Sequence, residues 1–222
     1  MLAGSMALNR MDAAKGAAIS LLAQAYKNRN KICLINFHGK TAEVVVPPTK
    51  SIAMTKNRLE SMPCGGGSPL AHALEMASKT GLNSIKIKKD VGRCILVLIT
   101  DGRANIPLCI SHGDEFDPDI YPSFDGMPTR EFLHDEVISS ARILGSFQDF
   151  DVVVIDTEDK FISTGLAKVT VRNHVRPRAE PPRSSTFSFI VTQETAEAAF
   201  AKYYRIDVRD VSSLQSVTKR LV

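Results

Sequence analysis

Three short segments of the sequence carry oxygen atoms that could bind a metal ion. They are Gly4-Ser5-Met6, the glycine-rich run Gly65-Gly66-Gly67-Ser68, and Thr100-Asp101-Gly102, which follows a continuous apolar run. Together they offer hydroxyl groups, one carboxylate and a glycine-rich backbone. Hard oxygen ligands of this kind suit Mg²⁺, which keeps several of its waters and takes few protein ligands. Asp101 is the only anion in the three segments, so it would anchor an ion bound there.

The hydrophobic pattern around these segments predicts that they meet at one edge of a sheet. Residues 94–100 are typical of a central parallel strand that is buried on both faces. Helical periodicity over residues 8–26 follows the first segment, and a second helix is predicted over residues 69–80, with proline in its first turn and Gly81 at its end. In open α/β sheets, ligands bind beyond the carboxyl ends of the strands. We therefore expect the three segments to lie close together.

The rest of the chain alternates between predicted strands and helices. Residues 31–37 and 42–46 are expected to form a hairpin through His38-Gly39-Lys40, and Pro47-Pro48 is expected to stop its second strand and mark a sheet edge. Further strands are predicted at residues 151–155 and 202–206, and further helices at residues 51–60 (with Ser51 as N-cap), 130–147, 163–171, 192–200 and 208–221. This alternation predicts one α/β domain over residues 1–222, with three layers and a doubly wound, mostly parallel sheet. No strand precedes the first helix, although such a sheet normally begins with one.

Two segments lack a predicted regular structure. Residues 107–129 form a long polar stretch, and loops of this length are usually functional or disordered. Its acidic part, residues 114–119, could hold a cation or remain a solvated loop. Residues 172–192 are basic and rich in proline, which suits an exposed insertion or a contact with an acidic partner or an anionic surface.

Composition excludes several classes of protein. The hydrophobic and charged fractions, 44% and 23%, are ordinary for a globular domain. A net charge of +4 without a clustered basic face gives no support for nucleic-acid binding. The apolar runs are far shorter than the ~20 residues that span a membrane, and no signal peptide pattern is present. The four cysteines show no zinc spacing, and Cys33 and Cys94 are expected to act as small buried hydrophobes, which predicts a soluble protein in a reducing compartment.

The same residues allow other interpretations. Asp101 could cap the turn that follows it, and the glycine run could cradle a phosphate at a helix N-terminus. In a phosphotransferase or hydrolase, Asp101 could act as a nucleophile or pair with Asp156 as acid and base. The chain contains neither a GxSxG elbow nor a GxxxxGK[ST] phosphate loop. The five histidines show no metal-ligand spacing, and His72 is expected to be a packed or solvated side chain.

Several motifs resemble a known family. Gly4-Ser5-Met6, followed by Asn9-Arg10-Met11 and Ala14-Lys15-Gly16, resembles the start of a von Willebrand factor A (integrin I) domain. More narrowly, the chain resembles the C-terminal integrin-I-like domain of magnesium chelatase D subunits. The stretches that carry this resemblance are VVVPP (residues 44–48), RLESMPCGGGSPL (58–70), DVGRCILVLITDGRANI (90–106), VVVIDTEDKFISTGLAK (152–168) and KYY (202–204).

The resemblance implies a metal-ion-dependent adhesion site. That site uses an Asp-x-Ser-x-Ser strand end, a Thr or Ser from a second loop and an Asp from a third. Ser5 matches the last Ser, Ser68 the second-loop position and Asp101 the third-loop Asp. Supporting positions are Gly4, Gly65, Gly66, Gly67, Thr100 and Gly102. Ala3 and Met1 replace two of the five expected ligands, so we expect Mg²⁺ binding to be weak or absent in this chain.

Two explanations compete for these replacements. Either a strand that ends in Asp lies upstream of Met1, or the site is degenerate and binds partners without a metal. The missing first strand favours the former.

The resemblance also implies a function without catalysis. In the family, the D subunit couples the AAA+ ATPase (I) subunit to the large porphyrin-binding (H) subunit, which inserts Mg²⁺ into protoporphyrin IX for chlorophyll synthesis. The integrin-I-like domain would be a docking module in the plastid stroma, and a partner carboxylate would complete the coordination of its metal. The alternative is a metal-dependent protein-interaction domain of the same fold that is unrelated to tetrapyrroles.

Overall fold

The structure is a computed structural model of the chain, and it describes residues 3–63, 66–87, 93–156, 195–199 and 201–205. Its helices are α1 (Ala3–Lys27), α2 (Ile52–Glu60), α3 (Leu70–Ile87), α4 (Leu108–His112) and α5 (Arg130–Gly145). Its strands are β1 (Ile32–His38), β2 (Thr41–Thr49), β3 (Cys94–Thr100), β4 (Ser123–Phe124), β5 (Met127–Pro128), β6 (Phe150–Asp156) and β7 (Lys202–Arg205). Residues 195–198 are also helical, within the helix predicted at 192–200.

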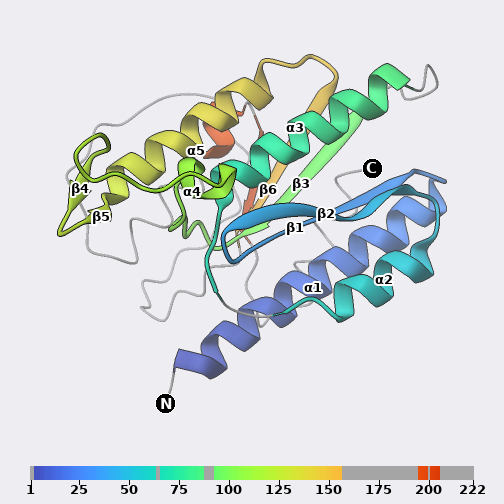
Figure 1. Cartoon of the computed structure of the whole chain (residues 1–222). Helices are drawn as coiled ribbons and strands as arrows, with labels where there is room; N and C mark the ends of the chain where they lie inside the picture. Colours follow the sequence, from blue (N-terminus) through green and yellow to red (C-terminus); the bar gives the residue numbers. More distant parts are fainter. Residues whose placement is uncertain (1–2, 64–65, 88–92, 157–194, 200, 206–222) are drawn as a thin grey trace.

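The predicted α/β class with a parallel sheet is confirmed. β3, β6 and β7 form a parallel sheet in that order, and β1 and β2 form a separate antiparallel hairpin. α3 contacts both the hairpin and β3, and α5 contacts α3 and β6. Figure 1 shows the hairpin between α3 on one side and α1 with α2 on the other.

The core lies between α3, α5 and the parallel sheet. Leu74 of α3, Val137 and Leu144 of α5 and Val154 of β6 are almost completely buried in one hydrophobic cluster. Burying a side chain of this size stabilises a fold by about 1.5–3 kcal/mol. The cluster fixes α3 on the sheet, and with it the loop that carries Ser68.

One predicted helix end is wrong. α3 continues past Gly81 to Ile87, so this glycine lies inside the helix. A Cβ atom at Gly81 would lie 2.6 Å from Cε1 of Phe150 and 3.2 Å from Sγ of Cys94. The glycine is therefore required by the close packing of α3 on the sheet and does not terminate the helix.

Two strand predictions also need correction. β2 runs through Pro47 and Pro48 to Thr49, because the pairing with β1 becomes irregular there and demands fewer ladder hydrogen bonds. The edge assignment of β2 holds, since β1 is its only strand neighbour among the described residues. β3 is parallel, as predicted, but within the described residues it pairs on one side only, with β6, and Ile95 is 51% exposed.

Two segments expected outside helices and strands contain regular structure. Gly4-Ser5-Met6, which was expected to precede the first helix, lies within α1, which begins at Ala3. The 107–129 stretch contains α4 and the short hairpin β4–β5. The predicted helices at residues 163–171 and 208–221 and the insertion at 172–192 lie outside the described residues. Within the described part of the chain, no helix combines the length and apolar character that crossing a bilayer requires.

Candidate functional site

Three loops meet beside the carboxyl end of β3. The turn of the β1–β2 hairpin contacts the glycine-rich loop, where the N–H of Gly39 donates to the carbonyl of Gly67 at 3.1 Å. The next residue of that loop, Ser68, contacts the segment after β3, where its N–H donates to Oδ1 of Asn105 at 2.6 Å. The predicted convergence of the glycine run with the segment after the apolar strand is therefore observed in the backbone.

The glycines permit this close approach. A Cβ at Gly67 would overlap the carbonyl oxygen of Gly39 and lie 2.9 Å from Cδ1 of Ile106. Gly66 has a φ of +100°, which favours glycine, and a Cβ there would lie 2.8 Å from Nε2 of His38. The packing of three loops explains these two glycines without a phosphate. Gly65 lies outside the described residues.

Asp101 caps the turn that follows β3. Its Oδ1 accepts a hydrogen bond from the N–H of Arg103 at 3.2 Å, and its Oδ2 lies 3.6 Å from Nε of Arg103. Oγ1 of Thr100 accepts a hydrogen bond from the N–H of Gly102 at 3.1 Å. The turn-capping alternative is thus confirmed. An ionised carboxylate has about four lone-pair sites, so it can accept hydrogen bonds and ligate a cation at the same time.

The third expected ligand lies in α1. Figure 1 shows the N-terminal end of α1, the loop before α3 and the carboxyl end of β3 on the same side of the molecule. The side chain of Ser5 is outside the described part, so a metal site formed by Ser5, Ser68 and Asp101 stays a prediction. The backbone of Asp156 pairs with Thr100 in the ladder, as expected for neighbouring strand ends, and its side chain is likewise not described.

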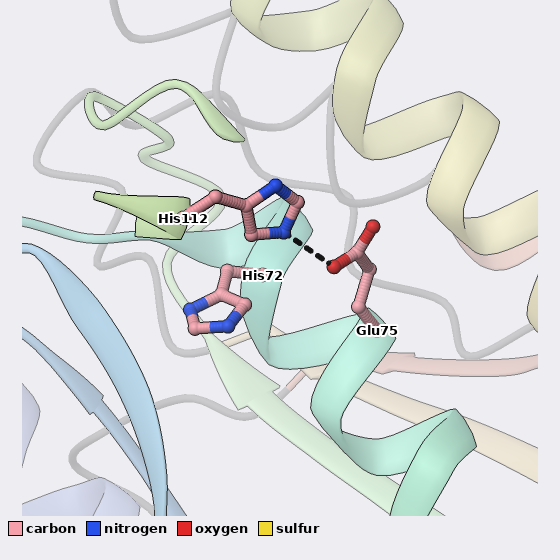
Figure 2. Close-up of side chains that lie close together, drawn as sticks. All are labelled: His72, Glu75 and His112. Atoms are coloured by element: carbon pink, nitrogen blue, oxygen red, sulfur yellow. Dashed lines mark hydrogen bonds and ion pairs between the residues drawn. The ribbon is translucent and has the colours of Figure 1, made fainter. Parts of the chain in front are cut away.

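A second polar cluster was not predicted. Figure 2 shows His72 and Glu75 of α3 together with His112 of α4. Nε2 of His112 lies 2.9 Å from Oε2 of Glu75, and one potential ligand atom from each of the three residues lies within 4.8 Å of the others. His72 and His112 stand far apart in the sequence, so no local spacing could reveal the cluster. Only the fold of the 107–129 stretch brings them together.

The hydrogen bonding of His72 argues against a three-ligand metal centre. Its Nδ1 accepts a hydrogen bond from the N–H of Ala42 at 3.0 Å, so the neutral ring carries its proton on Nε2. Neither nitrogen then offers a free lone pair to an ion. Burial, and next the charge of His112, hold the pKa of His72 below its ordinary value, which keeps the ring neutral. His72 joins α3 to the outer edge of β2, and the pair Glu75–His112 joins α3 to α4.

Comparison with known proteins identifies the fold family. The sequence pattern of the von Willebrand factor type A domain matches residues 1–103. An uncharacterized protein of Methanocaldococcus jannaschii is 31% identical over 163 residues, which cover 73% of this chain and 80% of that protein. Residues 1–103 of this chain therefore carry the sequence pattern of the von Willebrand factor type A domain. The crystal structure of the SpRpn10 VWA domain has the same fold, with a TM-score of 0.51 at 11% identity, covering 94% of this domain and 82% of that chain.

The narrower resemblance is confirmed as well. The magnesium-chelatase 67 kDa subunit of Heliobacterium mobile is 40% identical to this domain over 216 residues. The match covers 97% of the domain and 26% of that subunit. The domain therefore spans about a quarter of the length of the chelatase subunit that it matches.

Proposed function

We propose that this domain is a docking module of a magnesium-chelatase subunit and has no catalytic activity of its own. The observation that carries the proposal is the 40% identity to a magnesium-chelatase subunit over 97% of the chain. In the proposed role, the domain couples an ATPase subunit to the large subunit that inserts Mg²⁺ into protoporphyrin IX. The location in a plastid stroma stays a prediction, because the relatives described above come from a bacterium and an archaeon.

The candidate metal site at the carboxyl end of β3, with Ser5, Ser68 and Asp101, would make the docking contact; it is called the strand-end site below. Asp101 and Ser68 offer a carboxylate and a hydroxyl from two loops that hydrogen bonds hold together through Asn105. This donor set fits Mg²⁺, although a single carboxylate binds it weakly. The ion would supply a positive charge, and a carboxylate of the partner would complete the coordination of the ion. Ser5 would be the third ligand of the domain.

The decisive experiment replaces Asp101 by asparagine in the full-length subunit. Oδ1 of the new side chain can still accept the hydrogen bond from Arg103, so the turn is retained while the charge is lost. We expect Asp101→Asn to abolish ATP-dependent insertion of Mg²⁺ into protoporphyrin IX by the reconstituted complex. The ATPase activity of the motor subunit alone should not change.

The matched control is Glu43→Gln, which removes an exposed carboxylate on β2. This variant should insert Mg²⁺ at the normal rate. If the wild-type subunit binds neither the ATPase subunit nor the porphyrin-binding subunit, the proposal is wrong and an interaction domain unrelated to tetrapyrroles is favoured. If Asp101→Asn supports normal insertion, the metal-dependent contact is wrong.

A further inference from the structure

The segment 113–129 presents large apolar side chains to solvent. Ile120, Phe124 and Met127 are 71%, 81% and 69% exposed. Phe124 and Met127 belong to the hairpin β4–β5, which Figure 1 shows beside the N-terminal end of α5. Single exposed apolar residues are common, but three of this size in one short segment are typical of an interaction surface.

Packing between aromatic rings fixes the conformation of the segment 113–129. Phe116 and Tyr121 stack with ring centroids 5.7 Å apart, and Phe132 of α5 packs against both rings. The hairpin turn has positive φ at Asp125 and Gly126, which matches the turn type favoured by two-residue hairpins. A partner would therefore meet exposed side chains on a rigid support, and binding would require little ordering of the loop.

A groove of about 600 Å³ joins this segment to the strand-end loops. Its lining includes Glu115, Phe116 and Met127 of the segment, together with Asn105 after β3 and Lys40 of the β1–β2 turn. Asn105 is the residue that hydrogen-bonds the loop of Ser68. The groove thus reaches the residue that holds the Ser68 loop, so one partner could contact both the groove and that loop.

The charge of the segment identifies the kind of partner. The sequence from 104 to 129 contains no lysine or arginine. Its acidic residues are all exposed: Asp114, Glu115, Asp117, Asp119 and Asp125. A complementary surface combines basic side chains with an apolar side chain that fills the groove.

We propose that the segment 113–129 and its groove form a second, metal-independent docking surface, which binds a basic and apolar face of a chelatase partner subunit. This inference rests on the docking role proposed above. The strand-end site would contribute a metal-dependent contact, and the segment 113–129 would contribute the apolar anchors. The two contributions can be separated by experiment, because they involve different residues and respond differently to chelation.

The test measures the affinity of the full-length subunit for the ATPase subunit and for the porphyrin-binding subunit, each with and without EDTA. The double variant Phe124→Ser, Met127→Ser removes the anchors and should weaken binding to one partner about tenfold or more, in both conditions. Its matched control is Ile143→Ser, an apolar residue that is 59% exposed near the other end of α5. The control should change the affinity by less than about twofold.

A second pair of variants tests the charge. Asp114→Asn with Glu115→Gln should slow association at low salt and reduce the dependence of the rate on ionic strength. Glu43→Gln, on β2, is the control and should change neither the association rate nor its dependence on ionic strength.

The outcomes distinguish this inference from the proposed function. If the anchor variant binds as tightly as the wild type while Asp101→Asn or EDTA abolishes binding, the second surface is wrong and the metal-dependent role stands. If the anchor variant loses binding and Asp101→Asn does not, the second surface stands and the metal-dependent contact is wrong.

Discussion

Ser68 and Asn105 are joined by hydrogen bonds in both directions. The N–H of Ser68 donates to Oδ1 of Asn105 at 2.6 Å, and the N–H of Asn105 donates to the carbonyl of Ser68 at 3.3 Å. The two residues are 37 positions apart in the sequence. Because Asn105 follows Asp101 closely, this contact fixes the hydroxyl-bearing loop relative to the segment that carries the carboxylate.

The first prediction concerns this contact. Asn105→Ala removes the side-chain acceptor and should lower the free energy of unfolding by about 0.5–1.5 kcal/mol, the usual net value of one hydrogen bond. Urea titration followed by circular dichroism measures the change. Asn83→Ala, at an exposed position of α3, is the control and should be neutral or slightly stabilising, because alanine is the better helix former. Equal effects of the two variants would show that the contact contributes nothing.

A second prediction concerns the packing of α3 on the sheet. Gly81→Ala places a methyl group against the ring of Phe150 and should destabilise the domain by about 1–3 kcal/mol through overpacking. The control is Gly16→Ala in α1, where a Cβ meets nothing within 4 Å. That variant should stabilise by about 0.5–1 kcal/mol, since alanine favours the helix. Thermal unfolding of both variants gives the comparison, and a stabilised Gly81→Ala variant would contradict the packing described here.

The sequence predicted most elements because their signals are local. The apolar run of β3 was predicted at its observed bounds, and Ser51 caps α2 as expected, its Oγ accepting from the N–H of Met54. The end of α3 was predicted wrongly at Gly81, because a glycine that ends a helix and a glycine that makes room for a neighbouring ring look the same in a sequence. Only the position of Phe150, far along the chain, distinguishes them.

The candidate site, like the helices and strands, was predictable only in part. The convergence of the Ser68 loop with the segment after β3 follows from the rule that strand ends share one edge of a sheet. The role of Asn105 was not predicted, because it depends on one side chain reaching a distant backbone N–H. The cluster of His72, Glu75 and His112 was missed for the same reason, since it requires the fold of residues 107–112.

A third prediction concerns thiol chemistry. Burial, and next the neighbouring Cys94, raise the pKa of Cys33 from 9.0 to about 11. Both thiols are half-buried, which agrees in part with the expectation that they are buried hydrophobes. The thiolate fraction of Cys33 at neutral pH is then about 100-fold below that of a thiol with the ordinary value, because two pKa units separate them. Alkylation by iodoacetamide, located by mass spectrometry, should be slower at Cys33 than in N-acetylcysteine, although the higher nucleophilicity of a more basic thiolate offsets part of this factor. Equal rates would contradict the buried environment.

The last prediction concerns pH and His72. The folded domain favours the neutral ring, because burial lowers the pKa of His72 and its Nδ1 accepts the hydrogen bond from Ala42. The nearby charges act in both directions, since His112 and Lys79 lower the pKa and Glu75 raises it. In the unfolded chain the pKa returns to 6.5, so the unfolded state binds more protons as the pH falls below that value. The contribution of His72 to the free energy of unfolding should therefore be fully present at pH 8. It should decrease as the pH falls through 6.5 toward the lower pKa of the folded state.

The variant His72→Asn isolates this effect from other titrating groups. Its Oδ1 can take the place of Nδ1 as acceptor for the N–H of Ala42, and the amide does not titrate. Urea titrations between pH 5 and 8 should show a smaller loss of stability on acidification in His72→Asn than in the wild type. The difference between the two curves belongs to His72, because Glu75, Lys79 and His112 are present in both. Parallel curves would mean that His72 does not change protonation on unfolding, and that its hydrogen bond to Ala42 does not determine the charge of the ring.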